Sequence, residues 1–186
     1  MHKALKTLSL AAAATICLAP WLATPAGAAT ATATITGGSL AFASPPPNVS
    51  FSATLNGSNQ TVTANQALDV SDGTGSGAGW SITATSTTFT TAGAVTLANN
   101  STTVASTPTT ACDGGSSCTL ATNSVSYPYT LPAAASAPAA TKVFNAAVNT
   151  GQGNQTVTVT WSLAVPSAAQ PGTYTSTWTL SLVSGP

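Results

Sequence analysis

Residues 68–85 read LDVSDGTGSGAGWSITAT, and the rest of the chain is organised around this stretch. It begins as a short strand and passes through a glycine-rich turn at residues 73–79, where positive φ is easily adopted. It then continues as a second strand, in which Trp80, Ile82 and Ala84 alternate with hydroxyl residues, the period of a half-buried β-strand. The stretch therefore predicts two strands joined by a flexible turn.

The same tryptophan-x-aliphatic unit returns twice, in two long alternating segments. Residues 156–165 place Val157, Val159, Trp161, Leu163 and Val165 on one face. Residues 173–183 place Tyr174, Ser176, Trp178, Leu180 and Leu182 on one face. Period-2 alternation over such a length predicts strands, and we expect these two to pair as an antiparallel hairpin.

Shorter segments elsewhere also carry strand patterns separated by turn signals. Further strands are expected at residues 29–36, 39–43, 49–55, 60–64 and 143–148, and weaker ones near Phe89–Leu97, Leu120 and residues 127–131. Asn56-Gly57 is a strong hairpin signal between two of them. Many short strands with turns between them, and no segment of helical period, predict an all-β antiparallel β-sandwich of the immunoglobulin-like kind.

The N-terminus has the pattern of a secretory signal peptide over residues 1–28. Lys3 and Lys6 precede an apolar run, and small residues end it, so we expect cleavage after Ala28. The alternative is an uncleaved anchor, but the apolar run is shorter than a spanning helix needs. Residues 29–186 then form a single domain, outside the membrane once the signal is cleaved.

The expected mature chain carries very little charge. Lys142 stands against Asp69, Asp72 and Asp113, for a formal charge of −2, and Arg, Glu, His and Met are absent after residue 28. Such a surface does not attract phosphates, which argues against nucleic acid or an anionic membrane as partner. Catalysis needs a titratable or nucleophilic group with its base, and no Ser-His or Cys-His pair can form. We therefore expect no enzyme and no cofactor.

Cys112 and Cys118 are the two cysteines of the mature chain, in the sequence CDGGSSC. In a secreted protein this spacing indicates one disulfide that closes a small loop. Redox chemistry is the alternative, although the spacing is not C-x-x-C. Zinc would need more ligands than two thiols provide.

Asp69 and Asp72 flank the start of the glycine-rich turn. Together with nearby carbonyl groups they are weak candidates for a calcium site, since calcium prefers oxygen ligands. The alternative, which we favour, is that they cap the turn.

The tryptophans have two interpretations. They are core anchors, or at least one lies on the surface and stacks on a sugar ring. Trp80 is the best surface candidate because it borders the flexible turn, whereas Trp178 and Leu180 lie within a long alternating strand and look more like core.

The sequence resembles the WxL domain family at two places. Residues 69–84, DVSDGTGSGAGWSITA, look like its proximal motif, and residues 172–182, GTYTSTWTLSL, look like its distal motif. The resemblance implies a secreted surface protein of the Gram-positive type that attaches non-covalently to peptidoglycan. It makes Trp80, Ile82, Trp178 and Leu180 the candidate ligand-binding residues.

Two functions are consistent with these observations. The first is a non-catalytic cell-wall protein that binds peptidoglycan or another neutral cell-wall glycan, with other surface proteins as a second class of partner. The alternative is a structural subunit of a surface fibre or coat, because uncharged Thr-rich edge strands favour association between strands.

Overall fold

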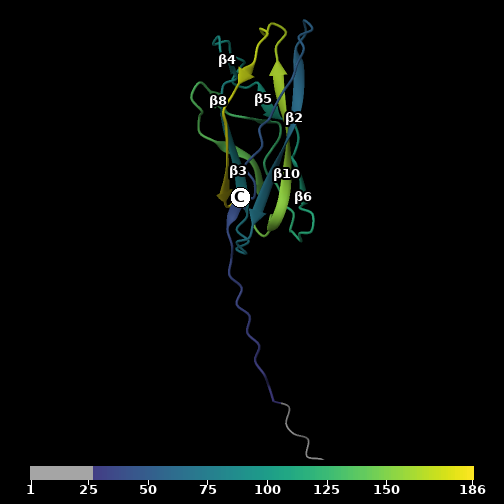
Figure 1. Cartoon of the computed structure of the whole chain (residues 1–186), viewed down its shortest axis with the longest axis vertical. Helices are drawn as coiled ribbons and strands as arrows, with labels where there is room; N and C mark the ends of the chain where they lie inside the picture. The colour runs from purple at the N-terminus through teal and green to yellow at the C-terminus, as the bar shows by residue number, and fades with distance from the viewer. Residues whose placement is uncertain (1–26) are drawn as a thin grey trace, which may run out of the picture. The chain divides into compact units, whose positions relative to one another are not determined.

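The computed structural model describes residues 27–186, and this part of the chain contains strands but no helix (Figure 1). Most of the predicted signal peptide, including Cys17, lies outside the described residues. The strands are β1 (Leu40–Phe42), β2 (Gln60–Asp72), β3 (Trp80–Thr87), β4 (Thr90–Thr91), β5 (Thr102–Val104), β6 (Thr109–Cys112), β7 (Tyr129–Thr130), β8 (Ala133–Ala134), β9 (Thr141–Ala146), β10 (Gly153–Val165), β11 (Tyr174–Thr175) and β12 (Trp178–Ser184).

The larger sheet is built around β10 and β2, which pair antiparallel along all 13 residues of each strand. Figure 1 shows the two strands side by side. Beyond β2 lies β1, while the other edge of β10 pairs with β5 and β6, and β7 follows β5. The alternation in β10 holds as expected, since Val157, Val159, Trp161 and Leu163 are all buried. Aliphatic and β-branched side chains on one face suit a half-buried strand.

The second sheet is built around β3. It pairs antiparallel with β12 on one side, and on the other side antiparallel with β9 and parallel with β8. In the ladder with β12, Trp80 lies opposite Ser184 and Trp178 lies opposite Ser86. Each indole therefore faces a small cross-strand neighbour, which leaves room for its volume. A separate two-stranded sheet joins β4 and β11.

The core lies between the inward faces of the two larger sheets. Its largest fully buried side chains are Trp80, Trp161, Phe144, Leu68, Ile82 and Leu131. Residues 36–186 form one compact unit, and the mainly antiparallel sheets confirm the predicted all-β sandwich. Among the described residues, no helix has the length and apolar character to cross a membrane.

The predicted hairpin between residues 156–165 and 173–183 is wrong. The first segment is β10 in the larger sheet, and the second is mainly β12 in the other sheet. Their inward faces meet instead of their edges: the ring centroids of Trp161 and Trp178 lie 4.8 Å apart. The two segments do not form a hairpin because β11, which lies between them in the chain, pairs with β4. The chain then continues into the second sheet.

Three other expected strands are also absent. Residues 29–36 and 49–55 form no ladder, and neither does the chain around Leu120, which is exposed. Residues 45–47 are all proline, which cannot donate to a ladder and confines strands to edges. The segment 47–54 is instead attached to β2 by side chains, since Gln66 Nε2 donates to Pro47 O and Gln60 Nε2 donates to Thr54 O.

Candidate binding groove

Trp80 lies at the end of the β3–β12 ladder where it pairs with Ser184. Its exposed fraction is 0%, and its Nε1–H donates a 2.8 Å hydrogen bond to Gly151 O. Its ring lies 5.9 Å from that of Phe144, tilted by 38°. Ile82 also has an exposed fraction of 0%. These values support the interpretation of Trp80 as a core anchor and contradict the alternative in which it stacks on a sugar at the surface.

Trp178 lies at the other end of the same ladder and is only partly buried. It packs edge-to-face on Trp161, at 70° between the ring planes. Phe89 and Phe51 lie 6.3 Å and 6.4 Å from it, centroid to centroid. These distances suit aromatic pairs, which prefer tilted or T-shaped contacts. Because β12 is the last strand of its sheet, one side of this aromatic cluster stays open.

Gln66 is a buried amide that connects the aromatic cluster to the proline segment. Trp161 Nε1–H donates to Gln66 Oε1 at 2.9 Å, and Gln66 Nε2 donates to Pro47 O at 2.7 Å. The amide therefore has a partner for its oxygen and for its nitrogen, as buried polar groups require. The sequence pattern did not single out Gln66, because a polar residue inside an alternating strand carries no signal of its partners.

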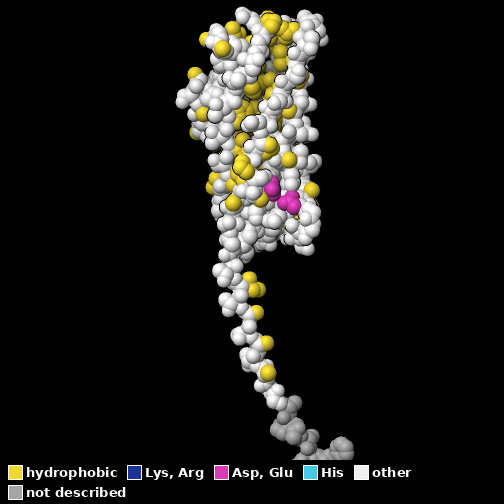
Figure 2. Space-filling model, in the orientation of Figure 1, with side chains coloured by type: hydrophobic (Ala, Val, Ile, Leu, Met, Phe, Trp, Pro, Cys, Tyr) yellow, Lys and Arg dark blue, Asp and Glu magenta, His cyan; other side chains and the backbone are white. Residues whose placement is uncertain are grey.

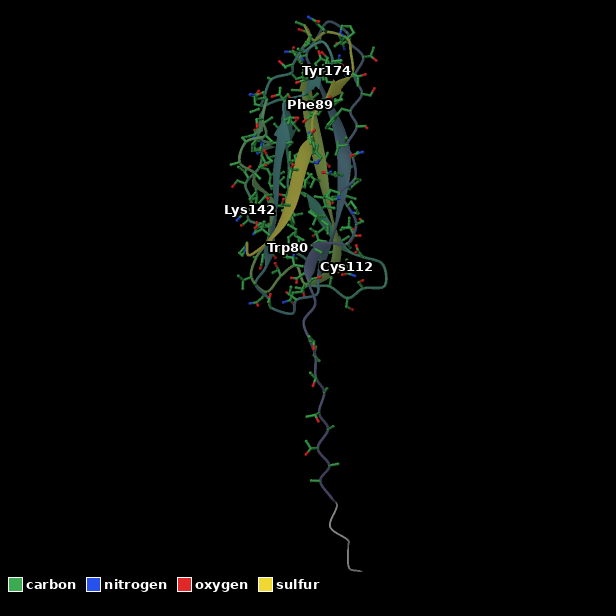
Figure 3. All side chains as sticks on the ribbon, turned by 60° about the vertical axis from the view of Figure 1, so that its left-hand side comes forward. Trp80, Phe89, Cys112, Lys142 and Tyr174 are labelled. Atoms are coloured by element: carbon green, nitrogen blue, oxygen red, sulfur yellow. A yellow bond between two sulfur atoms is a disulfide. The ribbon has the colours of Figure 1, made fainter. Side chains whose placement is uncertain are left out.

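Two adjoining hollows open at the Trp178 end, with volumes of about 620 Å³ and 700 Å³. Both are lined by Val49, Ser50, Phe89 and Tyr174. We call the two together the binding groove. Figure 2 shows hydrophobic side chains gathered in a hollowed strip on the upper part of this face, at the end where Figure 1 labels β4. Figure 3 shows Phe89 and Tyr174 near each other at this end, and Trp80 at the opposite end.

The two hollows differ in their walls. The first is mainly apolar, with Leu55, Val62, Leu163 and Val165 beside the turn at residues 169–173. The second takes its walls from residues 46–50 and residues 174–180. Trp178 and Leu180 line this second hollow, so the structure brings two of the four predicted ligand-binding residues to the groove. Trp80 and Ile82 line neither hollow.

No charged side chain is among the described residues that line the groove. The acids are engaged elsewhere. Asp113 Oδ1 accepts from Thr156 Oγ1 at 2.7 Å, and Asp69 Oδ2 accepts from Ser44 Oγ at 3.4 Å. Lys142 is exposed on β9, and Figure 3 shows it away from Phe89 and Tyr174. The groove therefore offers rings, hydroxyls and amides to a ligand.

The two weak calcium candidates do not converge. Leu68, Val70 and Asp72 are buried, so Asp69 lies on the other face of β2 because strand side chains alternate. Asp72 Oδ1 accepts from the N–H of Thr74 at 3.1 Å and from its Oγ1 at 2.7 Å. Within residues 27–186 no group of three or more His, Cys, Asp or Glu is placed to hold a metal ion. Asp72 caps the glycine-rich turn, as we favoured.

The predicted disulfide is present. Cys112 and Cys118 are bonded, with their Cα atoms 5.6 Å apart. The loop lies beside the end of β10, where Thr119 N–H donates to Gln152 O and Gly151 N–H donates to Thr119 O. In Figure 3 Cys112 lies at the Trp80 end, away from the groove.

Two tyrosines lie between the sheets outside the groove. Burial raises the pKa of Tyr127 to about 12, and the hydrogen bond with the Asn123 side chain lowers it by a smaller amount. Tyr127 Oη donates to Val143 O at 2.7 Å, which requires the neutral phenol. Burial also raises the pKa of Tyr129. These side chains attach residues 127–130 to β9.

A fold of two packed β-sheets with a concave, uncharged and aromatic-lined surface is typical of a binding module. Comparison with protein families agrees: the WxL domain family, described as surface cell wall-binding, matches residues 30–186. The chain therefore belongs to the WxL domain family, as the two motifs indicated, and is a secreted protein that associates with the cell wall at the cell surface. Searches among curated proteins and solved structures returned no match.

The two family motifs have different surroundings in this fold. They lie on neighbouring strands, β3 and β12, with their tryptophans at opposite ends of one ladder. The proximal tryptophan is enclosed, with Gly185 N–H donating to Gly79 O and Asn149 N–H to Gly77 O around it. The distal tryptophan faces the groove.

Proposed function

We propose that the groove binds a neutral glycan of the cell wall, with peptidoglycan as the ligand, and that the protein catalyses no reaction. The observation that supports this proposal is the lining of the groove: Phe51, Phe89, Tyr174 and Trp178 surround hollows that carry no charge. Sugar rings present C–H groups on their faces and hydroxyls on their edges. Aromatic rings bordered by a few hydroxyls and amides match both features.

Tyr174 is the groove residue best suited to a test. It lines both hollows and is partly exposed, and its Oη donates only to Gln170 O, within the turn beside it. Its removal therefore takes away a contact surface without opening the core. Central aromatic anchors typically contribute about 2 kcal/mol or more to binding, so Tyr174→Ala is expected to weaken wall binding at least about tenfold.

The experiment is co-sedimentation of the protein with purified peptidoglycan. Leu120→Ala is the matched control, because Leu120 is 47% exposed and lines neither hollow. We expect wild type and Leu120→Ala to sediment with the wall alike and Tyr174→Ala to stay in solution. Equal sedimentation of the folded Tyr174→Ala variant would place the ligand elsewhere.

A second candidate function is a structural subunit of a surface fibre or coat. The observation that favours it is that β12 ends its sheet with no further strand beside it among the described residues. Uncharged edge strands of this kind are available for pairing with another chain.

A further inference from the structure

The free edge of β12 carries unpaired main-chain groups. Thr87 N–H donates to Thr177 O, and Gly185 N–H donates to Gly79 O, so the main-chain groups of the odd-numbered residues point toward β3. In an antiparallel ladder the main-chain N–H and C=O groups of successive residues point alternately to the two sides of the strand. The N–H and C=O groups of Trp178, Leu180 and Leu182 therefore point away from β3, and no described strand pairs with them.

This edge borders the second hollow of the groove. Residues 46–50 form the opposite wall, and Gln66 fixes that wall through its bond to Pro47 O. The edge at Trp178 and Leu180 therefore borders an uncharged hollow, and β1 also lies close to β12. Natural proteins protect edge strands with charges, prolines or bulges, and the seven residues of β12, WTLSLVS, contain no charge and no proline.

Residues 29–36 have the pattern of a strand that fits such an edge. They read ATATATIT, form no strand in this structure, and are exposed along their whole length. Alternation places Ala29, Ala31, Ala33 and Ile35 on one face and threonines on the other. Ile35 is 93% exposed, far more than any other large hydrophobic residue of the described chain.

The donor and the acceptor match in length, charge and pattern. The eight residues of the donor, with one small apolar face, would lie against the seven residues of β12. The donor's threonines would continue the outward row of hydroxyl side chains on β12. Small alanines suit an approach to Trp178 and Leu180, and Ile35 supplies the bulk that fills a hollow. Neither segment carries a charge that would be buried on pairing.

We propose that residues 29–36 of one copy add as a strand to the free edge of β12 in a second copy. Each copy then offers one donor and one acceptor, a heterologous contact that extends into a linear chain of copies. This proposal gives the second candidate function a mechanism and does not require the groove to bind glycan. Under the proposed function, the added strand and the glycan would both use the second hollow, so assembly and wall binding would compete there.

The test is sedimentation of the protein as secreted, across concentration, with no wall material present. Wild type is expected to form assemblies larger than a dimer. Ile35→Lys places a charge on the donor's apolar face and is expected to raise the concentration needed for assembly at least about tenfold. The control Val148→Lys changes a residue that is 57% exposed outside the groove and is expected to assemble like wild type.

A peptide with the sequence of residues 29–36 tests the acceptor without altering the fold. In excess it is expected to cap the β12 edge and dissolve the assemblies, whereas the same peptide with lysine for Ile35 leaves them intact. Wild type that stays monomeric at every concentration, or Ile35→Lys that assembles normally, overturns the proposal. A peptide without effect overturns it too, since the acceptor edge must then lie elsewhere. None of these outcomes bears on peptidoglycan binding by the monomer.

Discussion

At the scale of single residues, Trp80 and Trp178 occupy matching positions at the two ends of one ladder but differ in burial. Trp80→Ala removes a fully buried side chain and is expected to lower the free energy of unfolding by about 3–5 kcal/mol. Trp178→Ala is expected to cost clearly less, because part of that ring already contacts solvent. Urea unfolding of both variants measures the two losses. A loss for Trp178→Ala that equals or exceeds the loss for Trp80→Ala would contradict the difference in burial between the two tryptophans.

Gln66 is the buried polar residue that stabilises the packing at the Trp178 end of the fold. Gln66→Leu leaves the indole N–H of Trp161 buried without an acceptor, so we expect a loss of about 1–3 kcal/mol in the free energy of unfolding. Asn65→Ala is the control on the same strand, since its bond to Thr160 is exposed, and its effect should stay within about 0.5 kcal/mol. A Gln66→Leu protein as stable as wild type would show that the amide is dispensable.

Tyr127 gives the fold a pH limit on the alkaline side. Its pKa is about 12 in the folded chain and 10.0 ordinarily, so the folded state holds the proton more tightly. The stabilisation is complete below pH 10 and is lost as the pH rises toward 12, when the unfolded chain ionises first. Thermal unfolding from pH 8 to pH 12 should show this fall, and Tyr127→Phe should show a shallower one. Stability that rises over this range in wild type would contradict it.

Residue patterns predicted burial where strand alternation applies, as for Val157, Val159 and Trp161. They also placed Trp80 on an apolar strand face, but they did not show what encloses it, because Gly151 and Phe144 lie far away in the chain. The groove itself was not predictable. Its walls come from five separate parts of the chain, and only Trp178 and Leu180 were among the candidates.

At the scale of elements, two turns of the chain depend on glycine for different reasons. Gly57 and Gly151 both have positive φ, 80° and 77°. A Cβ on Gly57 meets nothing within 4 Å, whereas one on Gly151 would meet Ala146 Cβ and lie 2.6 Å from Trp80 Nε1. The pair therefore separates backbone strain from steric conflict.

Gly57→Ala is expected to cost about 1 kcal/mol for its backbone conformation alone. Gly151→Ala should cost at least about 1–3 kcal/mol more, because the added methyl displaces the Trp80 ring. Chemical denaturation of the two variants measures both values. Equal losses would mean that Trp80 is not held as tightly as its contacts with Gly151 indicate.

Strand patterns located β2, β3, β9, β10 and β12, but they did not reveal the partners of these strands. Period 2 says which face of a strand is apolar and nothing about which neighbour its edge will find. The expected pairing of residues 156–165 with 173–183 relied on closeness in sequence. In the fold β10 pairs with β2 over 13 residues, a longer ladder than β12 offers. Residues 49–55 alternate like a strand but follow three prolines and form no ladder.

At the scale of the whole molecule, the small number of charged residues bears on the proposed function. The described chain has one lysine and three aspartates, and none of them lines the groove. Attraction between charges weakens as salt is added, whereas contacts between rings and uncharged sugars do not weaken in that way. The mode of attachment to the wall can therefore be read from its response to salt.

The most direct measurement is the affinity of the protein for purified peptidoglycan between about 0.1 M and about 1 M salt. Contact through an uncharged aromatic groove predicts an affinity that stays constant or rises slightly across this range, and that drops for Tyr174→Ala at every salt concentration. Binding that disappears at high salt, with no difference between wild type and Tyr174→Ala, would contradict attachment through the groove.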